Sequence, residues 1–502
     1  MRAKKTSNVF LAFIFHRRDE SMIDFTIIGG GVIGTLIARE LSKYNVSILL
    51  LEKENDIGNH ATLANSAIVH SGHDPKPGSL KAQLCVRGNS LYESLSKELK
   101  IPLIFSGAFV MARDTDEVET LEMLYQRAIQ NGVKQVALLD PEEARKQEPN
   151  MADGILKVLD LPTTKVTYPW EIAIAALQNA QENGAQYRLN AKVTKITPLE
   201  EGFEIEINED ERINTQYVIN AAGVYADELG KFVEQEMPYK ITPRRGEYYV
   251  LDKKVKGFVE RVLYPVPSEK GKGVLVVPQV HGNILLGPTS EFQDEKENRD
   301  NHSDHLHWIK RDSEKLAKNI PFDLIIRTFS GLRATSTYSD FYIQPAKAYP
   351  QFIHVAGIDS PGLTAAPAIA EYVVNTLLNA DETFTKKKDF NPFRTKKKPF
   401  HESTLEEKIA LILDDRRYGN IVCKCERVTE AEVVEAIHSA VSSPTVKGIK
   451  KRVRAGSGLC QGGYCENTVV KLIARELKIP LTEVEYYEKN TAILWKETKV
   501  KR

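Results

Sequence analysis

The chain has 502 residues, 42% hydrophobic and 27% charged, so it can bury a large core and should divide into two or three domains. Its 68 basic residues balance 68 acidic ones, which excludes the net field that favours nucleic acid or an anionic membrane surface. The five cysteines are few and grouped, and no run approaches the roughly eighteen apolar residues of a membrane span, so a reducing, cytoplasmic location is expected.

The N-terminal segment, residues 1–21, carries an apolar run of seven residues at 9–15, preceded by basic residues. This run is minimal for the apolar region of a signal peptide, and it leads into charged residues without a small-residue cleavage site. We therefore interpret residues 1–21 as a disordered or mis-assigned leader. Met22, which directly precedes the first predicted strand, is a candidate true start.

A nucleotide-binding pattern follows. Residues 24–28 form a short apolar strand, the segment 29–34 reads Gly-Gly-Gly-Val-Ile-Gly, and residues 35–43 have apolar side chains at helical spacing. A second strand is predicted over 46–51 and ends at Glu52, twenty-one residues after the second motif glycine. Strand, G-x-G-x-x-G loop, helix, strand and acid in this order indicate a Rossmann-like dinucleotide-binding unit.

Each motif residue has a physical role in such a unit. Gly29 permits the tight turn, Gly31 lets backbone amides approach a pyrophosphate, and Gly34 lets the helix pack on the sheet with its N-terminus facing the phosphate charge. Glu52 is expected to accept a hydrogen bond from a ribose hydroxyl. The motif alone does not distinguish NAD from FAD.

Four further segments resemble the D-amino-acid-oxidase-like FAD-dependent oxidoreductases: residues 56–66, 191–196, 217–227 and 352–364. In that family the first wraps the pyrophosphate and flavin, the second meets the adenine, and the third re-enters beside the dinucleotide. The fourth leads into a helix, here 365–378, whose N-terminal dipole would face the flavin N1 and C2 carbonyl. The resemblance spans about residues 22–380.

This resemblance implies an α/β fold, α+β overall, in which a Rossmann-like FAD-binding domain carries an inserted antiparallel-sheet substrate domain. It also implies a set of FAD contacts. These are Gly29, Gly31, Gly34, Glu52, Thr62, Asn65, Ser66, Val193, Ala222, Gly223, Gly331, Gly357, Gly362, Leu363 and Thr364.

The substrate side is expected in the insertions between these segments. Residues 246–251, 273–278 and 283–288 are strand-like and bounded by Gly and Pro. Residues 64–82 resemble the corresponding stretch of two subfamilies, the glycerol-3-phosphate oxidases and dehydrogenases and the L-2-hydroxyglutarate oxidases, where it borders the isoalloxazine. Ala67 stands where these subfamilies commonly have Gly.

Oxidation of a secondary alcohol requires a hydride acceptor, a base and cations for an anionic substrate. FAD is the acceptor, and His70 is the first candidate for the base, because imidazole titrates near neutral pH and this position lies next to the flavin in the resembling enzymes. His73 is the second candidate. Arg333, in a Gly-Leu-Arg turn typical of the family, is expected to bind the substrate anion through its guanidinium fork. Lys272 and Tyr249 are lesser candidates.

Apart from Cys85, the cysteines form two close pairs near the C-terminal end of the sequence, Cys423 with Cys425 and Cys460 with Cys465. Two thiolate pairs from separate loops can converge into four sulfur ligands, which suits a two-iron, two-sulfur cluster or a structural zinc. The C-x-C and C-x4-C spacings differ from the usual C-x2-C of zinc knuckles and favour iron. Helices are predicted after both pairs, over 429–437 with Thr429 as cap and over 467–477.

Residues 454–465 resemble the signature of bacterioferritin-associated-ferredoxin-like (BFD-like) [2Fe-2S] domains, a match covering about 419–480. In that family such domains are fused to anaerobic glycerol-3-phosphate dehydrogenase subunits and related flavoproteins. The basic residues of this region are expected to offset cluster charge, to dock an acidic acceptor or to face solvent. They are Lys447, Lys450, Lys451, Arg452 and Arg454.

The expected organisation is a leader (1–21), an oxidoreductase (22–381), a linker (382–418), a small helical [2Fe-2S] domain (419–480) and a tail (481–502). Within the oxidoreductase, FAD-binding segments are expected at 22–89, 166–236 and 325–381, and substrate-domain segments at 90–165 and 237–324.

The expected function is an FAD-dependent dehydrogenase that oxidises a small anionic 2-hydroxy compound and passes electrons through the cluster. sn-Glycerol 3-phosphate, giving dihydroxyacetone phosphate, is the favoured substrate, and L-2-hydroxyglutarate is the alternative. A rival hypothesis is an electron-relay subunit without its own substrate, or a zinc-stabilised scaffold. The expected partner is an electron-accepting protein or quinone, the latter compatible with a peripheral membrane position.

Overall fold

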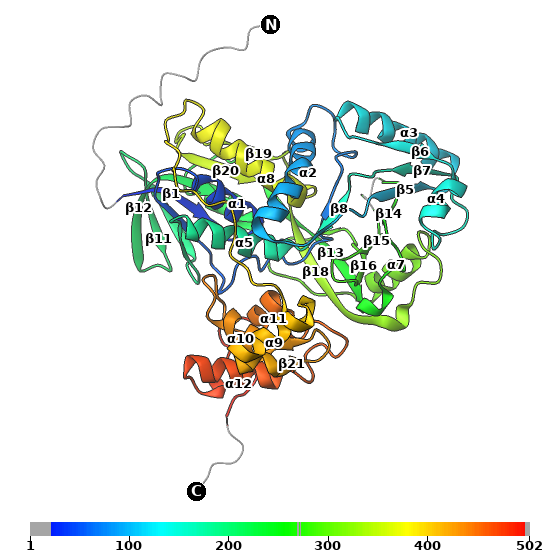
Figure 1. Cartoon of the computed structure of the whole chain (residues 1–502). Helices are drawn as coiled ribbons and strands as arrows, with labels where there is room; N and C mark the ends of the chain where they lie inside the picture. Colours follow the sequence, from blue (N-terminus) through cyan, green and yellow to red (C-terminus); the bar gives the residue numbers. More distant parts are fainter. Residues whose placement is uncertain (1–21, 269–270, 272, 497–502) are drawn as a thin grey trace.

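The computed structural model describes residues 22–268, 271 and 273–496. They form two large sheets side by side and a small helical domain below them (Figure 1). Among these residues, no helix is both long and apolar enough to cross a bilayer. The expected leader, residues 1–21, lies outside the described part.

The first sheet is built around the nucleotide motif. Its path is β19 (Tyr342–Pro345), β20 (Phe352–Ala356), β12 (Glu211–Asn220), β1 (Ile23–Ile28), β2 (Ile48–Leu51) and β9 (Gln186–Arg188). All neighbours along this path are parallel except β19 and β20. The other half of β12 carries an antiparallel pair, β10 (Val193–Pro198) and β11 (Phe203–Ile207).

Helices bury the apolar face of this sheet. They are α1 (Val32–Leu41), α2 (Leu80–Leu99), α5 (Pro169–Glu182) and α8 (Gly362–Glu371). Phe25 and Ile27 of β1 are fully buried beneath them, as expected for strands covered by helices. Each such side chain contributes about 1.5–3 kcal/mol of burial free energy. The predicted strand, glycine loop, helix and second strand are therefore all present.

The second sheet is mostly antiparallel. Its path is β17 (Glu291–Phe292), β13 (Ile241–Leu251), β16 (Ile284–Gly287), β15 (Leu275–Pro278), β14 (Val262–Pro265), β5 (Ala108–Ala112), β7 (Lys157–Asp160) and β6 (Ala137–Leu139). β18 (Ile325–Ser336) pairs with β13 along its whole length, and only β14 and β5 are parallel among the described neighbours. Helices α3 (Thr115–Gln130) and α7 (Ser303–Ser313) pack on this sheet. The first sheet with its helices is called the first, or flavin, body, and the second sheet with its helices is called the second body. A small sheet lies between them and consists of β3 (Ile68–Val69), β8 (Lys165–Thr167) and β4 (Leu103–Ile104).

Two boundaries differ from those expected from the sequence. The boundary between 89 and 90 falls inside α2, whose Tyr92, Leu95 and Leu99 join the core of the first sheet. The segment 325–336 was expected in the FAD-binding body but forms β18 of the second sheet.

The C-terminal domain has its own small core. It contains α9 (Leu405–Asp414), β21 (Ile421–Cys423), β22 (Val428–Thr429), α10 (Glu430–Ile437), α11 (Val446–Val453) and α12 (Glu466–Leu477). Thr429 caps α10 in a capping box with Glu432, as the sequence predicted. Val484 of the expected tail also joins this core.

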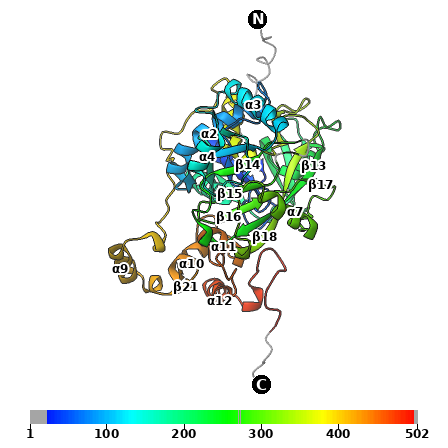
Figure 2. The ribbon, with the colours of Figure 1, turned by 90° about the vertical axis from the view of Figure 1, so that its right-hand side faces the viewer.

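The expected linker is more structured than its composition indicated. Residues 385–394 run across the first body, where Thr385 O accepts from Asn45 N and the Arg394 side chain is buried. The last part of the expected linker forms α9 of the C-terminal domain, which has no buried residue and stands at the edge of the molecule (Figure 2).

Candidate active site and cysteine centre

A cavity of about 1560 Å3 is lined by residues of both large sheets. This volume exceeds the roughly 300–1,000 Å3 of ordinary small-molecule pockets, and it suits a dinucleotide together with a second molecule. The sequence-predicted residues that line it are Gly29, Gly31, Glu52, Thr62, Asn65, Ser66, His70, Val193, Ala222, Gly223, Gly331, Arg333, Gly357, Gly362 and Leu363. Gly34, His73 and Thr364 lie outside this lining.

The glycine loop brings β1, α1 and β12 into close contact. Gly29 has φ +113°, and a Cβ there would lie 2.5 Å from the Ala221 carbonyl oxygen. A Cβ on Gly34 would lie 2.0 Å from the Gly29 oxygen, so the helix can pack here only through a glycine. Gly31 precedes α1, and the next amide donates to Thr62 Oγ1 at 3.0 Å. The loop therefore places the N-terminus of α1, the positive end of the helix dipole, at the cavity, as a pyrophosphate site requires.

Glu52 ends the second strand and lines the cavity beside this loop. Its Oε2 accepts from Gly30 N at 2.6 Å and its Oε1 from Glu54 N at 2.9 Å. Burial raises the pKa of Glu52 even though both amides favour its charged form. Each carboxyl oxygen offers a second acceptor position, so the geometry fits a ribose hydroxyl.

The first turn of α8 is fixed at the cavity by contacts behind it. Thr364 Oγ1 accepts from His70 N at 2.9 Å. A Cβ on Gly88 of α2 would lie 2.0 Å from Thr364 O, so α2 and α8 touch backbone to backbone. Thr364 thus positions Gly362 and the positive end of the helix dipole at the cavity rather than lining it.

The loop over residues 61–66 rests on β18. A Cβ on Gly331 would lie 2.1 Å from Ala64 O, and Ser66 Oγ lies 3.2 Å from Tyr248 Oη. Ala67 has φ +62°, the left-handed conformation that favours glycine. The glycine that resembling subfamilies carry here therefore matches the backbone, and alanine keeps the same conformation at a cost of about 1 kcal/mol.

His70 follows β3 and is the only histidine candidate of the two that lines the cavity. Its Nδ1 lies 3.0 Å from Tyr264 Oη, and its carbonyl accepts from Asn89 Nδ2 at 2.9 Å. Burial raises the pKa of Tyr264 well above the usual value. His73 is buried behind the cavity, with its ring edge-on to Tyr264. The geometry favours His70 as the base and adds Tyr264, which sequence reasoning missed, as the residue that holds its ring.

Two arginines line the cavity from paired strands. Arg333 of β18 is opposite Arg244 of β13, and Arg333 donates to the neutral carbonyls of Arg244 and Thr289 at 3.5 and 3.3 Å. Burial and the neighbouring Arg333 both lower the pKa of Arg244. Asp359 contacts Lys81 Nζ at 2.8 Å and Arg244 Nη2 at 3.8 Å. This side of the cavity therefore has an excess of positive charge, which suits an anion.

The lesser candidates fare differently. Tyr249 does not line the cavity, whereas its neighbour Tyr248 does, because successive residues of a strand face opposite sides of a sheet. Lys272 lies outside the described residues. Arg244 was missed because the sequence does not reveal which residue of one strand is opposite Arg333.

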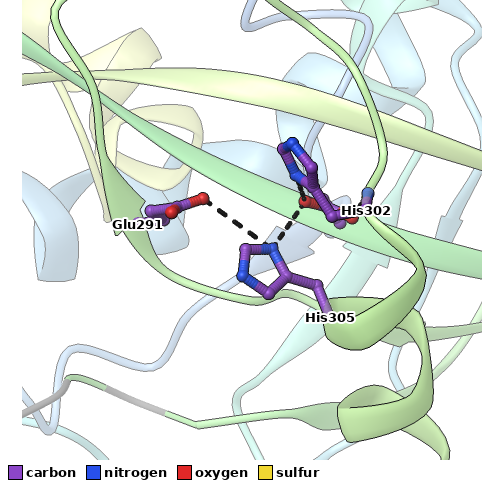
Figure 3. Close-up of side chains that lie close together, drawn as sticks. Glu291, His302 and His305 are labelled. Carbon is purple, nitrogen blue, oxygen red and sulfur yellow. Dashed lines mark hydrogen bonds and ion pairs between the residues drawn. The ribbon is translucent and has the colours of Figure 1, made fainter.

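A cluster of possible metal ligands, Glu247, Glu291, His302 and His305, lies at the start of α7 (Figure 3). His305 Nδ1 and His302 Nδ1 are 2.8 and 3.2 Å from the same oxygen of buried Glu247. Arg245 also belongs to this group, with Nη2 bonded to Glu291 and 2.9 Å from His302 Nδ1. The guanidinium already supplies the cation at this position, so we interpret the cluster as an ion-pair network that ties α7 to β13 and β17.

The four cysteines come together as predicted from their spacing. Cys425 Sγ and Cys460 Sγ are 3.8 Å apart, and a Cβ on Gly458 would lie 2.3 Å from Cys425 Cβ, so the two loops touch closely. A hydrogen bond with Cys465 lowers the pKa of Cys423 to about 6. Cys423 and Cys465 are buried, while Cys425 and Cys460 are half-buried. Four converging sulfurs with backbone amides directed at them fit an iron-sulfur cluster.

The cysteine domain is held to the first body by buried charges. Lys451 Nζ lies 2.8 Å from Asp56 and 2.7 Å from Asn59 Oδ1, and Arg452 lies 2.9 Å from Asp56. Burial opposes ionisation of Asp56, but Arg452 and Lys451 outweigh it and lower its pKa. Gly58, within the same loop, lines the cavity. The basic residues 451 and 452 thus face the flavin body, and neither solvent nor an acceptor.

Comparison with known proteins identifies both parts of the chain. Residues 24–376 match the family described as FAD dependent oxidoreductase, which covers well over half of the sequence. The chain belongs to this family. Residues 421–475 match the BFD-like [2Fe-2S] binding domain. FAD and a [2Fe-2S] cluster are therefore its cofactors, and the predicted fold class, family and cofactors are confirmed.

Several relatives cover most of the chain. It is 45% identical over 478 residues, 95% of this chain and 99% of the relative, to a protein named glycerol 3-phosphate dehydrogenase from Caloramator mitchellensis. It is 33% identical over 285 residues, 54% of this chain and 61% of the relative, to the human mitochondrial L-2-hydroxyglutarate dehydrogenase. The structure of the FAD-bound L-alpha-glycerophosphate oxidase from Mycoplasma pneumoniae matches with a TM-score of 0.70 at 30% identity, covering 75% of this chain and 99% of that one.

Proposed function

We propose that this FAD-dependent oxidoreductase oxidises sn-glycerol 3-phosphate to dihydroxyacetone phosphate and passes the electrons through its [2Fe-2S] cluster to a one-electron acceptor. The observation that carries this proposal is one cavity holding an imidazole and a pair of arginines, His70 with Arg333 and Arg244. The 45% identical relative, named for the same substrate and matched over nearly its whole length, supports it.

The arginine pair would bind the phosphate. A phosphate monoester carries about 1.5 to 2 negative charges at neutral pH, and guanidinium forks bind its oxygens in bidentate geometry. Arg333 is available for this because its two hydrogen bonds in the structure are long and go to neutral carbonyls. Asp359 would keep Arg244 and Lys81 oriented without neutralising both of them.

His70 would take the proton of the C2 hydroxyl. Because Tyr264 Oη is hydrogen-bonded to Nδ1 of His70, Nε2 is the ring nitrogen that would take that proton. The Thr364 and Asn89 contacts fix the His70 backbone, so the ring keeps its place as the substrate binds. FAD supplies the acceptor for the hydride from C2, and product formation therefore requires one hydride and one proton to leave the substrate.

Anaerobic flavin reduction tests this proposal. Holoprotein is mixed with sn-glycerol 3-phosphate, L-2-hydroxyglutarate, sn-glycerol 1-phosphate and glycerol, and bleaching near 450 nm is followed. We expect fast bleaching by sn-glycerol 3-phosphate, and little by glycerol, which lacks the anion, or by sn-glycerol 1-phosphate, which presents the wrong face of C2.

Two outcomes would contradict the proposal. Bleaching by L-2-hydroxyglutarate at lower concentration than by sn-glycerol 3-phosphate would assign the other substrate. A flavin that no member of the panel reduces, but that a chemical reductant does, would favour the electron-relay hypothesis.

A further inference from the structure

A continuous series of contacts joins the cavity to the cysteine centre. It begins at Ser66, which lines the cavity, and at the adjacent Ala67, whose carbonyl accepts from Thr167 N at 3.0 Å. Tyr168 follows Thr167 in the chain and is buried, with its ring 4.1 Å from that of Trp170. Tyr168 therefore directly follows β8, the strand that pairs with β3, whose Ile68 lines the cavity.

Arg454 connects Tyr168 to the cysteine domain. Its Nη1 donates to Tyr168 Oη at 2.9 Å, and its Nε donates to Glu426 Oε2 at 3.0 Å. Glu426 is the covalent neighbour of Cys425, one of the half-buried cysteines. The side chains of Arg454 and Glu426 are only 14% and 8% exposed, so water screens this link little.

Lys253 of the second body holds the same loop from the other side. Its Nζ donates to Cys425 O at 2.7 Å and to Glu426 Oε1 at 3.0 Å. The two oxygens of Glu426 are thus bound by different bodies, Oε1 by the oxidoreductase and Oε2 by the cysteine domain. This arrangement holds the Cys425 backbone against the oxidoreductase.

We infer that Tyr168, Arg454 and Glu426 are positioning residues that hold Cys425 at the oxidoreductase body, so that electrons enter the cluster at this cysteine. The inference rests on the proposed electron flow from FAD to the cluster, and leaves the substrate open. Two electrons cross the interface for each substrate, one at a time. Each electron would reduce one ferric ion of the cluster to ferrous, and a one-electron oxidant such as ferricyanide would then take up that electron.

Two substitutions test the link in the full chain with both cofactors. Tyr168→Phe keeps the ring and removes the hydroxyl, and Arg454→Met removes the charge while keeping a similar length. Arg454 has φ +65°, a conformation that costs methionine no more than arginine, so the comparison is free of a backbone effect. Arg417→Met is the matched control, because Arg417 pairs with Asp415 inside the same domain.

The first measurement is light-driven reduction of the flavin under anaerobic conditions, with a tertiary amine such as EDTA as the electron donor and with freeze-quenched samples reporting the paramagnetic signal of the reduced cluster. Reduction of the cluster should be slowed in both variants and unchanged in Arg417→Met. The second is hydrogen exchange of the amides at 423–427, which needs no turnover. Loss of one hydrogen bond to a charged group should increase opening there about tenfold, equivalent to about 1.4 kcal/mol.

Cluster reduction at the parent rate in both variants would overturn the inference, as would unchanged exchange at 423–427 or a parent cluster that the reduced flavin does not reduce. Arg454→Lys, which can reach one partner but not both, should be intermediate, which separates a lost contact from a misfolded domain. Because light replaces the substrate, failure of the proposed substrate and failure of the relay give different results.

Discussion

Replacing Arg333 with methionine should weaken substrate binding by roughly 30- to 150-fold. A charge-assisted hydrogen-bonded pair contributes about 2–3 kcal/mol, and each 1.4 kcal/mol is tenfold in affinity. In the free enzyme Arg333 donates only weakly, to two neutral carbonyls at 3.3 and 3.5 Å, so its loss should change the stability of the fold by less than about 0.5 kcal/mol. Binding should persist at a reduced level because Arg244 remains.

The assay is an anaerobic titration in which the rate of flavin bleaching is followed against sn-glycerol 3-phosphate concentration, giving Kd and a limiting rate. Arg333→Lys should weaken binding about tenfold, because a point charge cannot reproduce the planar fork. Arg327→Met is the control, since Arg327 lies on the same strand but outside the cavity lining. A Kd for Arg333→Met within threefold of the parent would refute the assignment.

Four further predictions concern the base, a buried histidine, the cluster ligands and the contact between the domains. His70→Ala should slow flavin reduction at saturating substrate by about 100-fold or more, measured by stopped flow; a change under threefold would exclude it as the base. Burial lowers the pKa of His281 to about 2, so as pH falls below about 6.5 only the unfolded chain takes up a proton at this residue. The free energy of unfolding of the parent, measured in urea, should therefore fall by about 2 kcal/mol between pH 7 and pH 5 as a result of His281 alone. His281→Asn should lack this part of the decrease; an equal decrease in parent and variant would refute the prediction. Cys460→Ser should lose iron and the visible cluster absorption while keeping FAD; full iron occupancy would remove Cys460 from the ligand set. Asp56→Asn should destabilise the protein by about 3 kcal/mol, because it leaves two buried cations unpaired. An unchanged melting temperature would show that these ion pairs do not hold the two domains together.

Local patterns predicted much of the fold. The glycine loop, its flanking strands and the helices after the cysteine pairs depend on neighbours within a few residues, and these elements are present. The sequence could not assign α2, because an amphipathic helix shows that one face is buried but not against which sheet. The same holds for β18, whose partner β13 lies about eighty residues away.

The residues of the site also fall into those that a local pattern predicts and those that only long-range pairing brings in. His70, Arg333 and the four cysteines belong to short motifs, and the structure places the first two on one cavity and the cysteines together. Arg244 and Tyr264 take part only through strand register and packing across the interface between the bodies. Residues within a motif can thus be recognised from the sequence, whereas residues that long-range strand pairing brings beside them cannot.

The charge pattern of α11 shows why composition alone misleads about partners. A run of basic residues is commonly a solvated face or a docking surface for an acidic protein. Here Lys451, Arg452 and Arg454 are directed inward, onto Asp56 and onto Glu426 with Tyr168. Charges already paired and desolvated within the chain cannot also attract a partner. These three side chains are therefore engaged within the chain, and their substitution should first weaken the contact between the cysteine domain and the oxidoreductase.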